Sequence, residues 1–217
     1  MIPVVIPAKP LDTALRRLGG VLDATERRAL QAAMLSDVLL AARAFSDRVV
    51  VVSGDEVVSA LAHEHGAVVA PDAIPPQGIN AAVARGIAVV QARAVMVLMG
   101  DLPCATVEDL RQVALAHLDG PGIVCAVSRD GTGTNAMVLG PPHIITTQFG
   151  PQSLSRHVAA AERAGVESTL VTAPGLMLDV DTPDDLAALV RISEDSHARR
   201  LCDALGVAER LSAVIGA

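Results

Sequence analysis

The sequence predicts an α/β protein with a mostly parallel sheet. Strand-like and helix-like segments alternate four times in succession along the chain, which is the pattern of right-handed β-α-β crossovers. The strand-like segments are apolar runs such as the four valines within residues 48–53, typical of parallel strands buried on both faces. Hydrophobic residues make up 51% of the 217 residues and aromatic ones only 1%, so the core must be aliphatic.

The amino-terminal half is expected to contribute four strands and three helices. Asp23 and Glu26 form a capping box that starts the first long helix, and Gly66 is a C-cap that ends the second. The expected strands are Ile2–Ile6, Arg48–Ser53, Val68–Val69 and Ala94–Met99, and the expected helices are Asp23 to about Ala44, Glu56–His65 and Asn80 to about Gln91.

The carboxy-terminal half continues the alternation and ends in a helical segment. Thr182 as N-cap and Pro183 at the first position start a helix that reaches about Ile192. We expect one domain over residues 1–192, with 193–217 as an amphipathic helical extension packed on the domain or at an oligomer contact. The other expected elements are helices Thr106–His117 and Gln152–Ala164 and strands Ile123–Val127, Ala136–Leu139, Leu170–Val171 and Met177–Leu178.

The charge and cysteine content exclude several classes of protein. A formal charge of −7 argues against nucleic acid or an anionic membrane surface as partner. No apolar run reaches the ~18 residues of a membrane span, and the amino terminus lacks the pattern of a signal peptide. We therefore expect a cytoplasmic protein. The three cysteines are scattered, which favours neither disulfides nor a zinc site.

Two polar loops suggest a binding site. In Asp130–Asn135 two glycines alternate with two hydroxyl residues, which allows a positive-φ turn whose N–H and O–H groups surround an oxyanion. An ordinary hairpin turn is the alternative. The loop Phe149–Ser153 has the same composition and opens a helix; Arg156 and His157 follow, and His157 is a weaker ligand candidate.

Acidic residues follow two of the expected strands. Ligands gather beyond the carboxyl ends of parallel strands, where we expect Lys9, Asp101, Asp179 and Asp181 to converge. Asp101 could be a turn residue, and Asp181 is partly explained by the helix start beside it. Together the three carboxylates could hold Mg²⁺, which prefers oxygen ligands and bridges protein to phosphate. Lys9 is the only lysine among 17 basic residues, which suggests a specific use for its ammonium group.

Taken together, these motifs resemble the CofC/FbiD-type guanylyltransferases of coenzyme F-420 biosynthesis. The resemblance covers about residues 2–190, and the order of the motifs makes it specific. The motifs are Ile6-Pro7-Ala8-Lys9, Arg17-Leu18, Gly78-Ile79-Asn80, Asp101-Leu102-Pro103, Gly131-Thr132-Gly133-Thr134-Asn135, Phe149-Gly150-Pro151-Gln152-Ser153, Arg156-His157 and Asp179-Val180-Asp181-Thr182-Pro183.

The resemblance implies a nucleotide-diphospho-sugar-transferase-like α/β sandwich of three layers. It also implies transfer of GMP from GTP to a phosphorylated three-carbon acid, with release of pyrophosphate. Among 2-phospho-L-lactate, 3-phosphoglycerate and phosphoenolpyruvate we expect phosphoenolpyruvate. Thr134, Gly150 and Ser153 match acceptor-binding positions of the family, and Asp101, Asp179 and Asp181 match positions associated with magnesium. Lys9, Arg17 and Asp101 are the expected catalytic residues, and Lys9, Arg17, Gly78 and Asn80 the expected nucleotide-binding ones.

One departure from the family concerns the first loop. Family members commonly have a lysine after the alanine, where this chain reads Ala14-Leu15-Arg16-Arg17-Leu18. Arg16 could replace the missing charge from the next position. A molybdenum-cofactor-type nucleotidyltransferase and a non-catalytic nucleotide-binding protein are the alternative functions. The family implies that the product passes to a downstream deazaflavin transferase, and a homodimer is compatible with the sequence.

Overall fold

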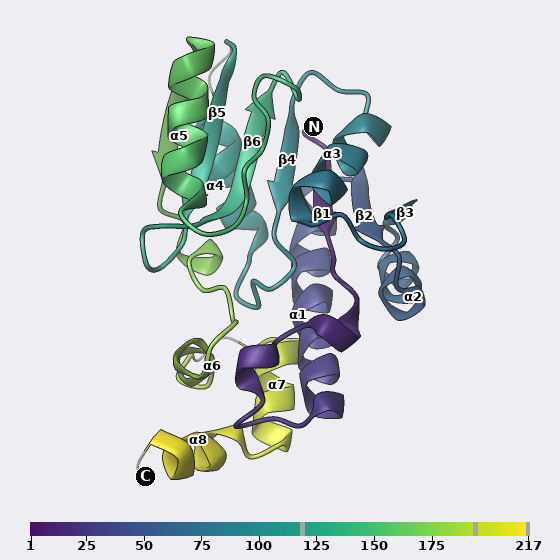
Figure 1. Cartoon of the computed structure of the whole chain (residues 1–217), viewed down its shortest axis with the longest axis vertical. Helices are drawn as coiled ribbons and strands as arrows, with labels where there is room; N and C mark the ends of the chain where they lie inside the picture. Colours follow the sequence, from purple (N-terminus) through teal and green to yellow (C-terminus); the bar gives the residue numbers. More distant parts are fainter. Residues whose placement is uncertain (118–119, 193–194, 216–217) are drawn as a thin grey trace.

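The computed structural model describes residues 1–117, 120–192 and 195–215. Its centre is a seven-stranded sheet in the order β3-β2-β1-β4-β6-β5-β7, shown in Figure 1. All pairings are parallel except those of β6 with β4 and β5, which confirms the mostly parallel sheet. The strands are β1 (Val4–Pro7), β2 (Val49–Ser53), β3 (Val68–Pro71), β4 (Val95–Leu98), β5 (Gly122–Val127), β6 (Thr134–Gly140) and β7 (Glu167–Val171).

Helices cover both faces of the sheet because successive side chains of a strand point to opposite sides. Val4 and Ile6 of β1 pack on the face covered by α1, α2 and α4, whereas Val5 packs on the face covered by α3 and α5. The result is the predicted sandwich of three layers (Figure 1). The helices are α1 (Ala24–Phe45), α2 (Glu56–Glu64), α3 (Ile79–Val89), α4 (Val107–Leu115) and α5 (Ser153–Ala164).

The predicted helix caps are present. Asp23 accepts a hydrogen bond from the Glu26 N–H, and Glu26 accepts one from the Asp23 N–H, as a capping box requires. Gly66, just after α2, has φ +72°, a left-handed conformation that favours glycine. Thr182 caps α6 (Pro183–Leu189). These local signals fix where the helices begin and end.

The predicted strand at Met177–Leu178 is wrong. Residues 174–176 form a short 3-10 turn, and the segment from there to Thr182 has no regular structure. Leu178 and Val180 look strand-like because both are buried, but they pack into a third apolar cluster away from the sheet. Isolated bonds satisfy this backbone instead, among them one from the Val180 N–H to the Asp101 carbonyl at 3.1 Å.

The third apolar cluster joins the carboxy-terminal helices α7 (His197–Ala204) and α8 (Val207–Ile215) to the rest of the chain. It contains residues of α6, α7, α8, the amino-terminal half of α1 and the loop that precedes α1, all gathered at the lower end of the molecule in Figure 1. Asp37 of α1 accepts hydrogen bonds from the N–H groups of His197 and Ala198 at the start of α7. The predicted boundary after residue 192 falls at residues 193–194, which lie outside the described residues.

None of the helices in the described part of the chain combines the length and the apolar character needed to cross a membrane.

Candidate active site

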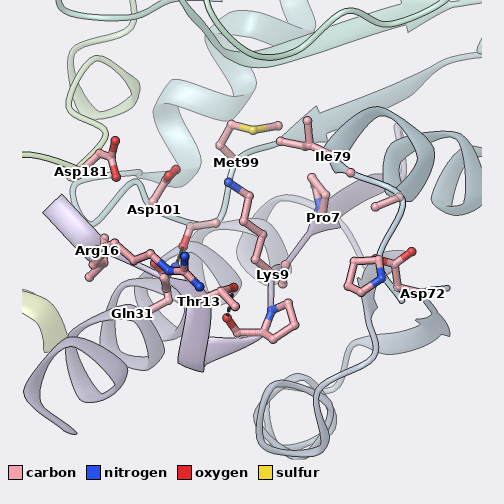
Figure 2. A pocket seen from close by; sticks show the side chains of 18 of the residues that line it. Pro7, Lys9, Thr13, Arg16, Gln31, Asp72, Ile79, Met99, Asp101 and Asp181 are labelled. Carbon is pink, nitrogen blue, oxygen red and sulfur yellow. Dashed lines mark hydrogen bonds between the residues drawn. The ribbon is translucent and has the colours of Figure 1, made fainter. Parts of the chain in front are cut away.

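A pocket of about 520 Å³ opens at the carboxyl ends of β1, β3 and β4. This is the position at which open α/β sheets bind ligands. Basic side chains and carboxylates line it: Lys9, Arg16, Arg17, Asp72, Asp101 and Asp181. In Figure 2 Lys9 extends across the middle of the pocket, with Asp101 and Asp181 on one side and Asp72 on the other.

The first loop places its arginines at the pocket through a buried leucine. Leu15, where the family commonly has lysine, adopts φ +52° and packs into the third apolar cluster. Arg16 and Arg17 follow on the 3-10 turn Arg16–Leu18, and both line the pocket. Arg17 donates a hydrogen bond to Asp181 at 2.8 Å. Arg16 therefore provides, one position later, a cationic group at the site.

Asp101 lies in an environment that disfavours its charged form. Burial, followed by the carboxylate of Asp179, raises the pKa of Asp101 from 3.8 to about 7, although Lys9 partly offsets the rise. Its Oδ1 atom is buried and has no hydrogen-bond partner among the described residues. Burial also raises the pKa of Asp179, which accepts a hydrogen bond from Asn135 Nδ2 at 3.1 Å.

The three predicted metal ligands come from two segments that meet at the sheet, but they do not surround one point. In the described ranges, no three His, Cys, Asp or Glu side chains are grouped closely enough to hold a metal ion. Asp179 is held by Asn135 and Asp181 by Arg17, so each points to its own partner. Joint binding of one metal ion by Asp101, Asp179 and Asp181 therefore stays a prediction. The orphaned Asp101 oxygen still fits a cation that takes one or two protein ligands.

The Asp130–Asn135 turn is not an open oxyanion nest. It is a hairpin connection between the antiparallel strands β5 and β6, and the Asp130 carboxylate accepts hydrogen bonds from Ser128 Oγ and from the N–H and hydroxyl of Thr132. These bonds lower the pKa of Asp130 to about 2. The anion that this turn binds is its own aspartate, so the alternative of a structural hairpin turn is the correct one.

Thr134 and Ser153 are buried residues that fix the Gly150 loop from the interior of the protein. Ser153 Oγ accepts a hydrogen bond from the Thr134 N–H at 2.9 Å, and both side chains are buried. The Thr134 hydroxyl contacts His157 Nδ1 at 3.1 Å. Neither side chain lines the pocket. Gly150 is exposed with φ +121°, a conformation that favours glycine. Acceptor binding by these three residues stays a prediction.

His157 is a structural residue. Its Nε2 accepts a hydrogen bond from the Gln148 N–H at 2.8 Å, so the neutral ring carries its proton on Nδ1 and donates to Thr134. Burial and the neighbouring Arg156 lower the pKa of His157 to about 4. Both ring nitrogens are therefore in use, and the candidate ligand role of His157 is not supported.

Of the two predicted nucleotide-binding residues near α3, only Gly78 lines the pocket. Gly78 has φ +91° and is the N-cap of α3. Asn80 instead makes a pair of hydrogen bonds with Phe149, one to its carbonyl at 3.0 Å and one from its N–H at 2.7 Å. Asn80 thus attaches the Gly150 loop to the start of α3, a positioning role that the sequence did not indicate.

Gln31 and Asp72 are among the pocket residues that the sequence analysis missed. Gln31 reaches the pocket from within α1 and donates to the Gly100 carbonyl at 3.1 Å, and no local pattern marks it. Asp72 follows β3 directly. The rule that selected Asp101, a carboxylate at the carboxyl end of a parallel strand, could have selected Asp72 as well.

Comparisons with known proteins show which family the sequence matches. The family model "Guanylyl transferase CofC like" matches residues 2–213. A protein from Roseiflexus sp. (strain RS-1) named phosphoenolpyruvate guanylyltransferase is 37% identical over 204 residues, which cover 93% of this chain and 90% of the relative.

Solved structures share the fold. A crystal structure described as a nucleotide-diphospho-sugar transferase from Desulfovibrio desulfuricans G20 superposes with a TM-score of 0.76 at 19% identity, covering 97% of this chain and 99% of the other. Glucosyl-3-phosphoglycerate synthase from Mycobacterium tuberculosis, solved with Mg²⁺ and uridine diphosphate, has a TM-score of 0.54 at 16% identity, covering 80% and 69%. The family match and the identity to the Roseiflexus protein confirm the sequence-based resemblance: the chain belongs to the CofC-like guanylyl transferase family.

Proposed function

We propose that the protein transfers GMP from GTP to phosphoenolpyruvate in coenzyme F-420 biosynthesis. The observation that carries the proposal is the pocket itself, which combines three basic side chains with the buried carboxyl group of Asp101 at the carboxyl edge of the sheet. Relatives named phosphoenolpyruvate guanylyltransferase support the choice of acceptor.

The proposed reaction is a displacement at the α-phosphorus of GTP. A phosphate oxygen of the acceptor forms a bond to the α-phosphorus, and the bond from that phosphorus to the oxygen bridging the β-phosphate breaks. That bridging oxygen keeps the electron pair, and pyrophosphate leaves. The product contains a new phosphoanhydride bond between GMP and the acid, and the count of atoms and charges balances without a redox partner.

This reaction requires positioning and charge stabilisation rather than a general base, because the attacking phosphate oxygen is already ionised at neutral pH. His157, which follows the predicted acceptor loop, uses both ring nitrogens in the structure. Lys9 and the guanidinium groups of Arg16 and Arg17 line the pocket and would oppose the repulsion between two polyanions. Arg17 is mostly exposed and paired with Asp181, so it is free to exchange that partner for a phosphate.

The acidic residues fit a divalent cation. Asp101, together with Asp179 or Asp181, would hold Mg²⁺, which commonly uses one or two carboxylates and completes its shell with water and substrate phosphate. The bound ion would supply positive charge where negative charge develops on the phosphates. The unpartnered, buried Oδ1 of Asp101 supports this assignment.

We further propose that Gly150 presents the loop that binds the acceptor, with Thr134 and Ser153 positioning it. Three sets of hydrogen bonds fix this loop: Ser153 to Thr134, His157 to Gln148, and Asn80 to Phe149. A loop held at three places needs little ordering when the acid binds, and preorganisation of this kind lowers the cost of binding.

The test is release of pyrophosphate from GTP in the presence of each of the three acids. We expect turnover to be fastest with phosphoenolpyruvate. Turnover with 2-phospho-L-lactate and none with phosphoenolpyruvate would contradict the acceptor assignment, and no turnover with any acid would favour a non-catalytic nucleotide-binding protein. The same proposal places the reaction in the cytoplasm and passes its product to a deazaflavin transferase. Light scattering would distinguish a monomer from a homodimer.

A further inference from the structure

The pocket has two ends of different chemistry. Arg16 lies on the side of Asp101 and Asp181, and the Lys9 ammonium group points to that side from the middle, whereas Asp72 lies at the other end (Figure 2). Arg17 belongs to the first end because it donates a hydrogen bond to Asp181. Asp72 follows β3 and Asp101 follows β4, and β2 and β1 lie between these strands. With about 4.8 Å between neighbouring strands, β3 and β4 are about 14 Å apart, enough for a nucleotide to extend from the end of one strand to the end of the other.

The end that contains Asp72 has the surroundings of a base-binding site. Ile79 and Ala82 lie one turn apart on α3, so they present the same face to the pocket, and Pro76 lies in the preceding loop. An apolar wall beside a single polar group is the usual composition of a site that orients a flat ring by a few hydrogen bonds.

The side chain of Asp72 is held in one orientation by hydrogen bonds to one carboxylate oxygen, which leaves the other oxygen able to accept hydrogen bonds from a ligand. Its Oδ1 accepts hydrogen bonds from the Ala73 N–H at 2.7 Å and from Arg85 Nη1 at 3.1 Å. Its Oδ2 accepts none from any residue in the described part of the chain. The side chain is only 10% exposed. Arg85 neutralises the carboxylate, which reduces repulsion of a triphosphate, and Gln77 in turn accepts from Arg85 at 2.9 Å.

An ionised carboxylate only accepts hydrogen bonds, and guanine is the purine that offers it two adjacent donors. The Watson–Crick edge of guanine carries an N1–H and a 2-amino group. Adenine presents an unprotonated N1 at the corresponding place and would meet the carboxylate with a lone pair. Sites built to bind a substrate N–H discriminate strongly against analogues that lack it.

We propose that Asp72 is the residue that selects guanine, by accepting hydrogen bonds from its N1–H and 2-amino group. The inference rests on the proposed use of GTP, and it adds the place of the base and the basis of purine selection. Arg85 is a positioning residue that fixes the carboxylate.

The test replaces an acceptor with a donor on the protein and a donor with an acceptor on the base. In Asp72→Asn, the amide oxygen can keep the bonds to Ala73 and Arg85 while the NH₂ group replaces Oδ2. That NH₂ group donates, so it suits xanthine, which has a carbonyl where guanine has its 2-amino group. Equilibrium binding of GTP, xanthosine triphosphate, inosine triphosphate and ATP is measured by calorimetry without acceptor, for the wild type and the variant.

We expect the wild type to prefer GTP, to bind inosine triphosphate more weakly and to bind ATP least. Asp72→Asn should weaken GTP binding by about tenfold or more, as expected when a hydrogen bond to a charged group is lost. It should also strengthen binding of xanthosine triphosphate, so that the preference between the two reverses. Asp12→Asn is the control, because it removes an exposed carboxylate of the first loop that pairs with Arg28 and does not line the pocket.

Equal changes for GTP and xanthosine triphosphate, or no change for either, would overturn the inference, as would a wild type that binds ATP as tightly as GTP. A reversed preference cannot arise from misfolding. Because the measurement needs no turnover, a protein that binds GTP selectively but releases no pyrophosphate would refute the proposed reaction and leave the inference standing. Pyrophosphate release by the wild type, together with an unaltered preference between GTP and xanthosine triphosphate in Asp72→Asn, would support the proposed reaction and overturn the inference.

Discussion

Replacing Asp101 with Asn separates the cost of burying a carboxylate from its use in catalysis. Burial and the neighbouring Asp179 raise the pKa of Asp101 from 3.8 to about 7. Because one pKa unit corresponds to about 1.4 kcal/mol, keeping this group ionised in the folded protein costs about 4 kcal/mol relative to the unfolded chain. Asn has nearly the same shape and no charge, so the variant does not carry that cost.

The effect on stability depends on pH with a definite sign. The folded protein binds the Asp101 proton more tightly than the unfolded chain does, so its stability falls as the pH rises from about 4 to about 7. Without divalent metal, Asp101→Asn should have the wild-type free energy of unfolding near pH 4. At about pH 8 that free energy should be higher than the wild-type value by up to about 4 kcal/mol. Urea denaturation in the presence of a chelator measures both values.

Asp101→Asn should lower the activity of the protein although it raises the stability. If Asp101 helps to hold magnesium against the phosphates, Asp101→Asn should lower turnover by about a hundredfold or more, as when preorganised electrostatic stabilisation is lost. The magnesium concentration for half-maximal rate should rise, and magnesium should stabilise the wild type more than the variant. Asp195→Asn, which removes an exposed carboxylate paired with Arg200, is the control. Near-normal turnover with unchanged magnesium dependence would refute the role of Asp101, whatever the stability of the variant.

Two further substitutions test the packing around the site. Ser153→Ala leaves the buried Thr134 N–H without its partner and should lower the free energy of unfolding by about 1–3 kcal/mol. The KM for the acid should rise, and the affinity for GTP should stay unchanged. Ser155→Ala, which removes an exposed hydroxyl of the same helix, is the control and should alter neither the free energy of unfolding nor the KM. Gly86→Ala would place a Cβ atom 2.3 Å from Val5 Cγ1 and 2.8 Å from Val52 Cγ2, so α3 must move from the sheet at a cost of about 1–3 kcal/mol. Thermal unfolding should show the loss in Gly86→Ala and none in Gly20→Ala, where a Cβ atom meets nothing within 4 Å; equal melting temperatures would refute this packing argument.

The sequence alone determined the features that depend on neighbouring residues. The capping box of Asp23 and Glu26 predicted the start of α1, and the valine run predicted β2, because caps and buried strands are set by side chains a few positions apart. The loops with Lys9 and Asp101 could be predicted to meet, since the carboxyl ends of parallel strands share one edge of the sheet. The order of the motifs identified the family, which the comparisons confirmed.

Only the tertiary structure decided which polar groups face the pocket and which face the interior. Thr134 follows an apparent binding loop, yet its hydroxyl contacts the buried His157, and the Asp130 carboxylate occupies its own turn. The placement of β3 beyond β2 brings Asp72 to the pocket, and nothing in the sequence specifies the order of the strands. The direction of a side chain follows from elements that pack together from distant parts of the chain, and a local pattern cannot contain that information.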